Sequence, residues 1–165
     1  MKVREALDLL KAIEMLQATP VARNVKFGYF LEHNRRTLEG MQATVRKTLE
    51  DPEIDTTIAA FEQDRIAALR DAAKKDEAGN PVLNGNAFVI EDQEAVLEQL
   101  TKDLLEKHPG IEDAFQARVK REAEMGDAEA VVELRKLPLA LWPDLPEGVP
   151  SNVLSTLYPL IQDEA

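Results

Sequence analysis

The side chains best suited to chemistry gather in one short stretch, residues 23–36. Arginine and lysine bind phosphate and carboxylate groups, and a flat aromatic ring stacks on planar or cationic ligands. On a helix, residues three or four apart share a face, so this spacing brings the side chains together. The stretch predicts a binding site for an anionic ligand such as a nucleotide, made by Arg23, Asn24, Lys26, Tyr29, His33, Arg35 and Arg36.

The charge of the chain gives this stretch a second interpretation. The whole chain has a formal charge of −11, whereas residues 20–50 hold six Lys/Arg against three Asp/Glu. An acidic surface repels nucleic acid, so we expect no direct binding to DNA or RNA. The cations can also pair with carboxylates of neighbouring helices, which keeps an acidic fold from repelling itself. Both interpretations stay open from the sequence.

Patterns typical of catalysis or metal binding are missing from the sequence. There is no cysteine, and His33 and His108 have no second histidine three or four residues away. Phosphate-binding glycine loops and the motifs of zinc and serine hydrolases are also absent. Asp76 and Glu77 resemble the start of a calcium loop, but Ala87 stands near the position of the required bidentate acid. We therefore expect no enzyme activity, no cofactor and no metal site.

A long helix is predicted to position the basic stretch, because residues 20–50 contain no internal proline. Seven positions spaced alternately by four and three form a seam of the kind that packs against another helix. Asn34 is the polar member, and a buried polar residue in a seam fixes register or oligomeric state. Alternatively, it lies at the solvent-exposed edge. The seam consists of Phe27, Leu31, Asn34, Leu38, Met41, Val45 and Thr48.

The following helix has a strong start signal, a capping Asp51 followed by Pro52 and an acid. A second seam runs through residues 54–72, and Arg65 is its polar member, with the same two interpretations as Asn34. So short a break between two long helices predicts an antiparallel helical hairpin. We expect residues 38–48 to be scaffold that packs on this second helix.

Shorter elements complete the predicted fold. An apolar stripe predicts a first helix over residues 2–18. The pair Asn84-Gly85 between short apolar runs predicts a β-hairpin over residues 81–90 with a type I′ turn. Alternating apolar residues predict a strand over residues 130–137, which we expect to be the third strand of the hairpin's sheet. Asp92 and Ser151 are expected to cap two of the remaining helices.

The fold class predicted is α+β and mainly α, with a long antiparallel helical hairpin, additional helices and a small antiparallel sheet. A chain of 165 residues with 44% apolar and 31% charged residues is typical of one soluble domain. Within residues 1–165 we expect a helical part at 1–75, the hairpin at 76–92, helices at 93–125, and a strand with a proline-rich wrapping tail at 129–165. No apolar run reaches the length of a membrane span.

The order of the elements resembles a family of small bacteriophage proteins of unknown function. Four segments within roughly residues 60–165 carry the resemblance: KKDEAGNPVLNGNAFVIED, EAVLEQLTKDLLEKH, VVELRKLPLALWPDLPEGV and VLSTLYPLIQDEA. Residues 109–127 depart from the family's pattern because they form an inserted or lengthened segment. The resemblance implies a phage or prophage product in the bacterial cytoplasm, and it implies no chemistry.

Three functional hypotheses follow from the sequence. The first is a non-enzymatic accessory protein that self-associates and binds a host or virion protein, because seams with polar positions suit helix-to-helix recognition. The second is a protein that binds and sequesters an anionic small molecule, such as a nucleotide signal of host defence, through the basic start of the long helix. The third is that acidic faces imitate nucleic acid and block a host nuclease or repressor.

Overall fold

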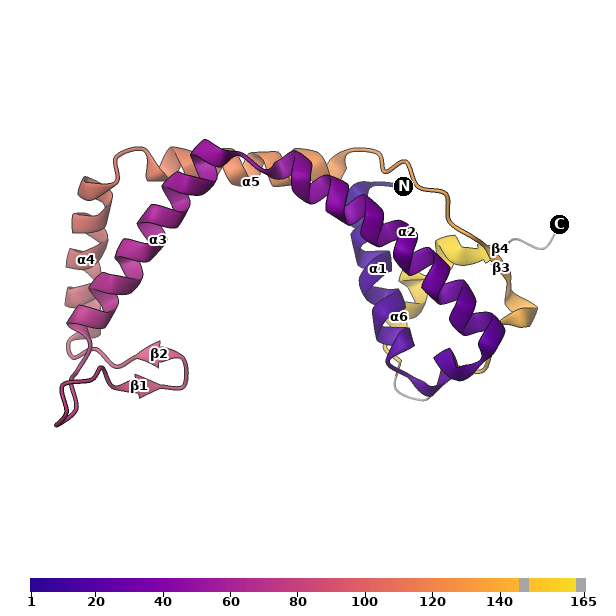
Figure 1. Cartoon of the computed structure of the whole chain (residues 1–165), viewed down its shortest axis with the longest axis horizontal. Coiled ribbons are helices and arrows are strands. Elements are labelled where there is room, and N and C mark those ends of the chain that lie inside the picture. Colours follow the sequence, from indigo (N-terminus) through magenta and orange to yellow (C-terminus); the bar gives the residue numbers. More distant parts are fainter. Residues whose placement is uncertain (146–148, 163–165) are drawn as a thin grey trace. The chain divides into compact units, whose positions relative to one another are not determined.

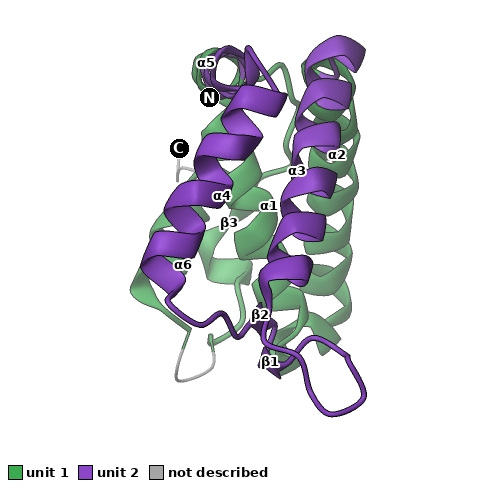
Figure 2. Cartoon of the chain, turned by 90° about the vertical axis from the view of Figure 1, so that its left-hand side faces the viewer, with its two compact units in different colours: residues 1–49, 122–165 green, residues 50–121 purple. Residues whose placement is uncertain are grey.

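The computed structural model describes residues 1–145 and 149–162, so residues 146–148 and 163–165 of the predicted tail lie outside the described part. The fold is α+β and mainly α, as the sequence predicts. The chain divides into two compact units (Figure 2), residues 1–49 with 122–165 as unit 1 and residues 50–121 as unit 2. The expected single domain stays a prediction.

Unit 1 is built on two helices that lie side by side (Figure 1). The first is α1 (Val3–Gln17), which agrees with the helix predicted over residues 2–18. A short 3₁₀ turn, η1, joins it to α2. The elements that follow α1 in unit 1 are η1 (Pro20–Arg23), α2 (Val25–Leu49), the end of α5 (Ile111–Asp127), β3 (Leu137–Pro138), η2 (Leu139–Leu141), α6 (Ser151–Thr156), η3 (Tyr158–Leu160) and β4 (Ile161–Gln162).

The core of unit 1 lies between α1, α2 and α6. Leu9 and Ile13 of α1 are fully buried, and Phe27 of α2 contacts Trp142 with ring centroids 5.2 Å apart. Each such buried side chain stabilises the fold by about 1.5–3 kcal/mol. Within unit 1 the α2 seam packs on α1. The predicted partner, the helix at 54–72, belongs to unit 2, so that packing stays a prediction. A seam specifies a helix face, and α1 offers an equally apolar face.

The predicted start of the long helix at residue 20 is wrong by five residues. The side chain of Asn24 accepts a hydrogen bond from the N–H of Phe27 at 3.1 Å, so Asn24 acts as the cap and α2 starts at Val25. The turn before it lies close over the helix. A Cβ atom on Gly28 would stand 2.3 Å from the carbonyl oxygen of Ala22.

Unit 2 contains α3 (Pro52–Ala72), β1 (Leu83–Asn84), β2 (Ala87–Phe88), α4 (Gln93–Lys107) and the first part of α5. The predicted start of α3 is confirmed, because the Asp51 side chain accepts hydrogen bonds from the backbone N–H groups of Glu53 and Ile54. Ile58 of α3 packs with Ile111 and Ala114 of α5, and α3 also packs along α4. The seam of α3 thus has α4 and α5 as its partners.

The predicted hairpin is present, but its turn is shifted by one residue. Leu83 pairs with Phe88 and Asn84 pairs with Ala87, so the two central residues are Gly85 and Asn86. Of these, only Gly85 has a positive φ, of 62°. A glycine with positive φ at the first central position is typical of a type II′ turn, whereas type I′ needs positive φ at both.

The strand predicted over residues 130–137 is largely wrong. At its two ends, Ala130 bonds to Met1 and β3 pairs in parallel with β4, and the hairpin's sheet contains β1 and β2 alone among the described residues. Residues 131–136 run between α5 and β3 as a segment outside the sheets (Figure 1). Of the predicted caps, Asp92 precedes α4 with φ of 49° but forms no capping hydrogen bond, and α6 follows Pro150.

Candidate functional site

Asn34, the predicted polar member of the α2 seam, is fully buried. Its Nδ2 donates a hydrogen bond to the carbonyl oxygen of Arg135 at 3.1 Å, and the Arg135 N–H donates to its Oδ1 at 2.8 Å. The side-chain amide of Asn34 thereby pairs both the N–H and the C=O of Arg135, as the backbone of a neighbouring strand would. Within unit 1, Asn34 holds the segment 131–136 against α2.

Two of the predicted cationic ligands are held by a carboxylate that the sequence analysis did not single out, Glu32. Arg35 Nε lies 2.9 Å from Glu32 Oε2, and Arg36 Nε lies 2.7 Å from Glu32 Oε1. The hydrogen bonds from Arg35, then Arg36 and Gln17, lower the pKa of Glu32 to about 2. Spacings of three and four residues on one helix were the available signal. These two arginines thus form salt bridges, but with a carboxylate of their own helix rather than with one of a neighbouring helix as the sequence analysis suggested.

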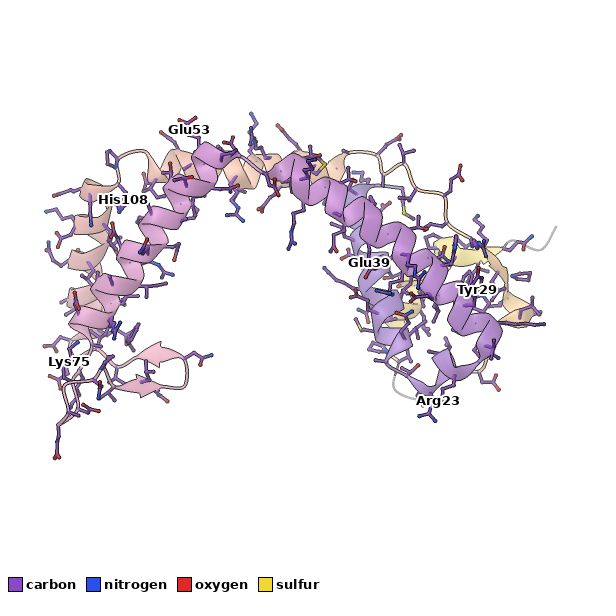
Figure 3. The ribbon with its side chains drawn as sticks, viewed as in Figure 1. Arg23, Tyr29, Glu39, Glu53, Lys75 and His108 are labelled. Atoms are coloured by element: carbon purple, nitrogen blue, oxygen red, sulfur yellow. The ribbon has the colours of Figure 1, made fainter. Side chains whose placement is uncertain are left out.

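The other members of the predicted anion site are spread along the start of α2. Arg23 is exposed on η1 and points away from the body of unit 1 (Figure 3), and Lys26 is exposed on α2. Tyr29 is 64% exposed, with the guanidinium carbon of Arg135 at 5.6 Å from its ring centroid. His33 is half-buried on the same helix, and Asn24 is the α2 cap described above. The anion-binding hypothesis stays a prediction.

Arg65, the polar member of the α3 seam, lies at the exposed edge rather than in the core. Its Nε and Nη2 donate to Glu62 Oε2 at 2.9 and 2.7 Å. An exposed ion pair of this kind contributes roughly 0.3–0.5 kcal/mol on a helix. Unlike Asn34, Arg65 therefore fixes no long-range contact.

The second histidine belongs to a structural contact of unit 2. His108 Nε2 lies 2.7 Å from Asp64 Oδ2, and Lys107 Nζ lies 2.8 Å from the same oxygen. The ring of His108 also meets the edge of Phe61, with centroids 5.6 Å apart. Hydrogen bonds from Lys107 and His108 lower the pKa of Asp64. These contacts join α3 to the end of α4 (His108 is labelled in Figure 3).

The second half of α2, which the sequence analysis assigned to scaffold, is the more open half. The seam is fully buried at Phe27, Leu31 and Leu38, whereas Met41 and Val45 are only partly covered. They line a groove of about 450 Å³ between α2 and the segment 128–133. The groove is lined by Val3, Thr37, Gly40, Met41, Thr44, Val45, Thr48, Met125, Ala128, Glu129, Ala130, Val131, Val132 and Glu133.

The groove has a mixed lining in which apolar side chains predominate and which includes Glu129 and Glu133. Its lining is mostly methyl groups and threonine hydroxyls, and Val131 on its rim is 97% exposed. Across residues 1–145 and 149–162, no group of three or more His, Cys, Asp or Glu side chains could hold a metal ion. Within those same ranges, no helix is long and apolar enough to cross a membrane.

Comparison with known proteins adds no relative to this description. No protein-family model matches the chain, and neither the curated proteins nor the solved structures gave a match. The groove, the segment 128–133 beside it and the contact of Asn34 with Arg135 are therefore the observations that bear on function.

Proposed function

We propose that this chain acts by binding proteins and not by catalysis: it associates with a second copy of itself and then with a further protein. The observation that carries the proposal is the open second half of α2, where the seam that is buried at Leu38 is only partly covered at Met41 and Val45. The groove beside these two residues separates α2 from the segment 128–133.

Physical reasons support the proposal that this open half of α2 is a binding surface. A helix segment without a packing partner has little stability in water, because most helical stability in proteins comes from packing of an apolar face. Full burial of an exposed methionine or valine side chain is worth about 1.5–3 kcal/mol, and Met41 and Val45 can gain the part of it that their partial burial leaves. That gain is useful for association, where apolar anchors in well-packed pockets supply most of the affinity.

The same surface has the charge to recognise an acidic partner. Arg46 and Lys47 are exposed on the last turns of α2, in a chain whose formal charge is −11. Opposite charges at the rim of an interface speed the encounter and select the partner. A second copy of this acidic chain meets that requirement, and so does an acidic host protein.

The resemblance to small bacteriophage proteins supplies the proposed setting. In that setting the further partner is a host or virion protein, and the chain acts in the bacterial cytoplasm. Inhibition of a host defence protein is one activity that this setting includes.

The test is the mass of the purified chain in solution, measured by light scattering over a range of concentrations. We expect a dimer for the natural chain and weaker association for Val45→Glu, which puts a charge into the groove. Gln42→Glu is the matched control, because Gln42 is exposed on the same helix and does not line the groove. Circular dichroism checks that both variants fold. A natural chain that stays monomeric at all concentrations refutes the proposal.

A further inference from the structure

We propose that two copies of the chain pair edge to edge as antiparallel β-strands through residues 132–136, with Leu134 on the two-fold axis. This inference rests on the proposed self-association and adds to it a contact apart from the groove, on the edge of the segment 132–136 that faces away from α2. It follows from which backbone groups of the segment are already used, from where the unused edge begins and ends, and from the charges along it.

The backbone groups of residues 128–136 point alternately to two sides of the segment. Along an extended segment, successive residues direct their N–H and C=O groups to opposite sides. The groups of Arg135 point to Asn34 on α2. On the other side, Ala130 N–H donates to the Met1 carbonyl at 2.9 Å, and the Ala128 carbonyl accepts from the Val3 N–H at 2.9 Å. Odd-numbered residues thus face α2, and even-numbered residues face the opposite edge.

The side chains of the segment agree with this extended description. Val131, Glu133 and Arg135 are exposed, whereas Val132 and Leu134 are half-buried and pack against the core of unit 1. An alternation of exposed and half-buried residues is what a strand lying on a core produces. One face of the segment is therefore fixed to unit 1, and its outer edge is left for another strand.

The edge that faces away from α2 has unpaired backbone groups, among the described residues, only between residues 131 and 137. The N-terminal stretch occupies this edge as far as Ala130, and Pro138 has no N–H to offer at the other end. Between these limits, the backbone groups of Val132, Leu134 and Lys136 form no hydrogen bond with another described residue. An edge strand with unpaired groups is a template for a second strand. The middle of this free edge is Leu134.

The charges of Glu133 and Arg135 independently favour the same register, with Leu134 on the two-fold axis. With Leu134 on the axis, Glu133 of each copy lies opposite Arg135 of the other, and opposite charges across a pair of strands stabilise it. Neither residue has an ion pair among the described residues; the Arg135 guanidinium rests over the exposed ring of Tyr29. Contact between two copies would therefore give both charges a partner.

The neighbouring registers fail on both grounds. An axis at Glu133 places two glutamates opposite each other and requires Ala130, which is already bonded to Met1. An axis at Arg135 places two arginines opposite each other and requires Pro138. Like charges directly opposite each other destabilise a strand pair. Only the register centred on Leu134 avoids both problems.

The chain has no cysteine, so the register can be read by disulfide formation. Glu133→Cys and Arg135→Cys chains are made separately and oxidised alone or as a mixture. Opposite residues of a non-hydrogen-bonded pair have Cα atoms about 4.5 Å apart, within the range that a disulfide spans. We expect covalent dimers in the mixture at about ten times the yield of either chain alone. Lys11→Cys, on an exposed position of α1, gives the background from random collision.

Charge reversal is the second readout. Glu133→Arg and Arg135→Glu should each weaken the dimer about tenfold, because two attractive pairs become repulsive. The double variant should restore the natural dissociation constant, which a merely structural role of either residue would not do.

Three results would overturn the inference. Glu133→Cys chains that link to themselves would place Glu133 on the axis, and Arg135→Cys chains that do so would place Arg135 there. A chain that dimerises without any link in the mixture, and without response to charge reversal, dimerises through another surface. In that case the proposed function stands and the strand pairing is wrong, whereas a monomeric natural chain refutes both.

Discussion

Replacement of Asn34 by leucine tests the most specific long-range contact of unit 1. Leucine has a similar volume, so the change removes both hydrogen bonds to Arg135 without opening a large cavity. Each such bond contributes about 0.5–1.5 kcal/mol net, and a backbone group left unpaired costs about 1–3 kcal/mol. The added apolar surface of leucine offsets part of this loss. Since Arg135 is exposed and water can reach part of its backbone, we expect a net loss of about 2 kcal/mol.

Trp142 provides a probe for unit 1 alone, because it is the single tryptophan of the chain and packs on Phe27 and Phe30. Urea unfolding followed by its fluorescence should show a lower midpoint with an unchanged slope. Amide exchange at Arg135 should accelerate about thirtyfold, which corresponds to 2 kcal/mol. Gln42→Leu, an exposed change on the same helix, is the control and should leave the midpoint unchanged. If Asn34→Leu is as stable as the natural chain, the two hydrogen bonds contribute nothing and the argument for a fixed segment fails.

Four further variants test the remaining contacts. Gly28→Ala should destabilise unit 1 by about 1–3 kcal/mol in urea unfolding, because its Cβ would meet the carbonyl oxygen of Ala22. Gly40→Ala has open space and should stabilise α2 by about 0.5–1 kcal/mol in the same assay, so equal effects would contradict the geometry. The pKa of Asp64 is lowered in the folded state, so its ion pairs stabilise unit 2 above its unfolded pKa and are lost as pH falls through the folded value. Asp64→Asn should therefore weaken the acid dependence of unfolding measured by circular dichroism. With a folded pKa of about 2, Glu32 should stabilise unit 1 fully above about pH 4.5, and the difference from Glu32→Gln in Trp142 fluorescence should vanish towards pH 2.

Local signals in the sequence predicted most of the helices, and distant contacts account for what it missed. Asp51 and the proline after it define the start of α3 through hydrogen bonds within three residues, so the sequence alone could reveal it. The pairing of Asn34 with Arg135 joins residues 101 positions apart. A polar residue in an apolar seam indicates that such a partner exists, but the spacing gives no information on which segment supplies it. The prediction of a strand at 130–137 was largely wrong for the same reason. Exposed and half-buried residues do alternate there, but the side chain of Asn34 forms the hydrogen bonds with Arg135 that a neighbouring strand would have formed.

The open groove follows from a difference in length between two helices, which explains why the seam of α2 divides into a buried and an open half. α1 has 15 residues and α2 has 25, so at about 1.5 Å per residue α2 is roughly 15 Å longer. The short η1 connection keeps the end of α1 beside the start of α2, so the two helices run in opposite directions. α1 therefore covers the seam from Phe27 onward, and this cover ends at the first residue of α1, Val3, which lines the groove. Beyond that point α1 no longer covers the seam, and Met41 and Val45 line the groove together with Met125 at the end of α5 and the segment 128–133. Once α1 is recognised as the partner, the lengths alone place the uncovered part of α2 where the groove is found. The second half of α2 is therefore the part of the chain at which the proposed protein binding is to be tested.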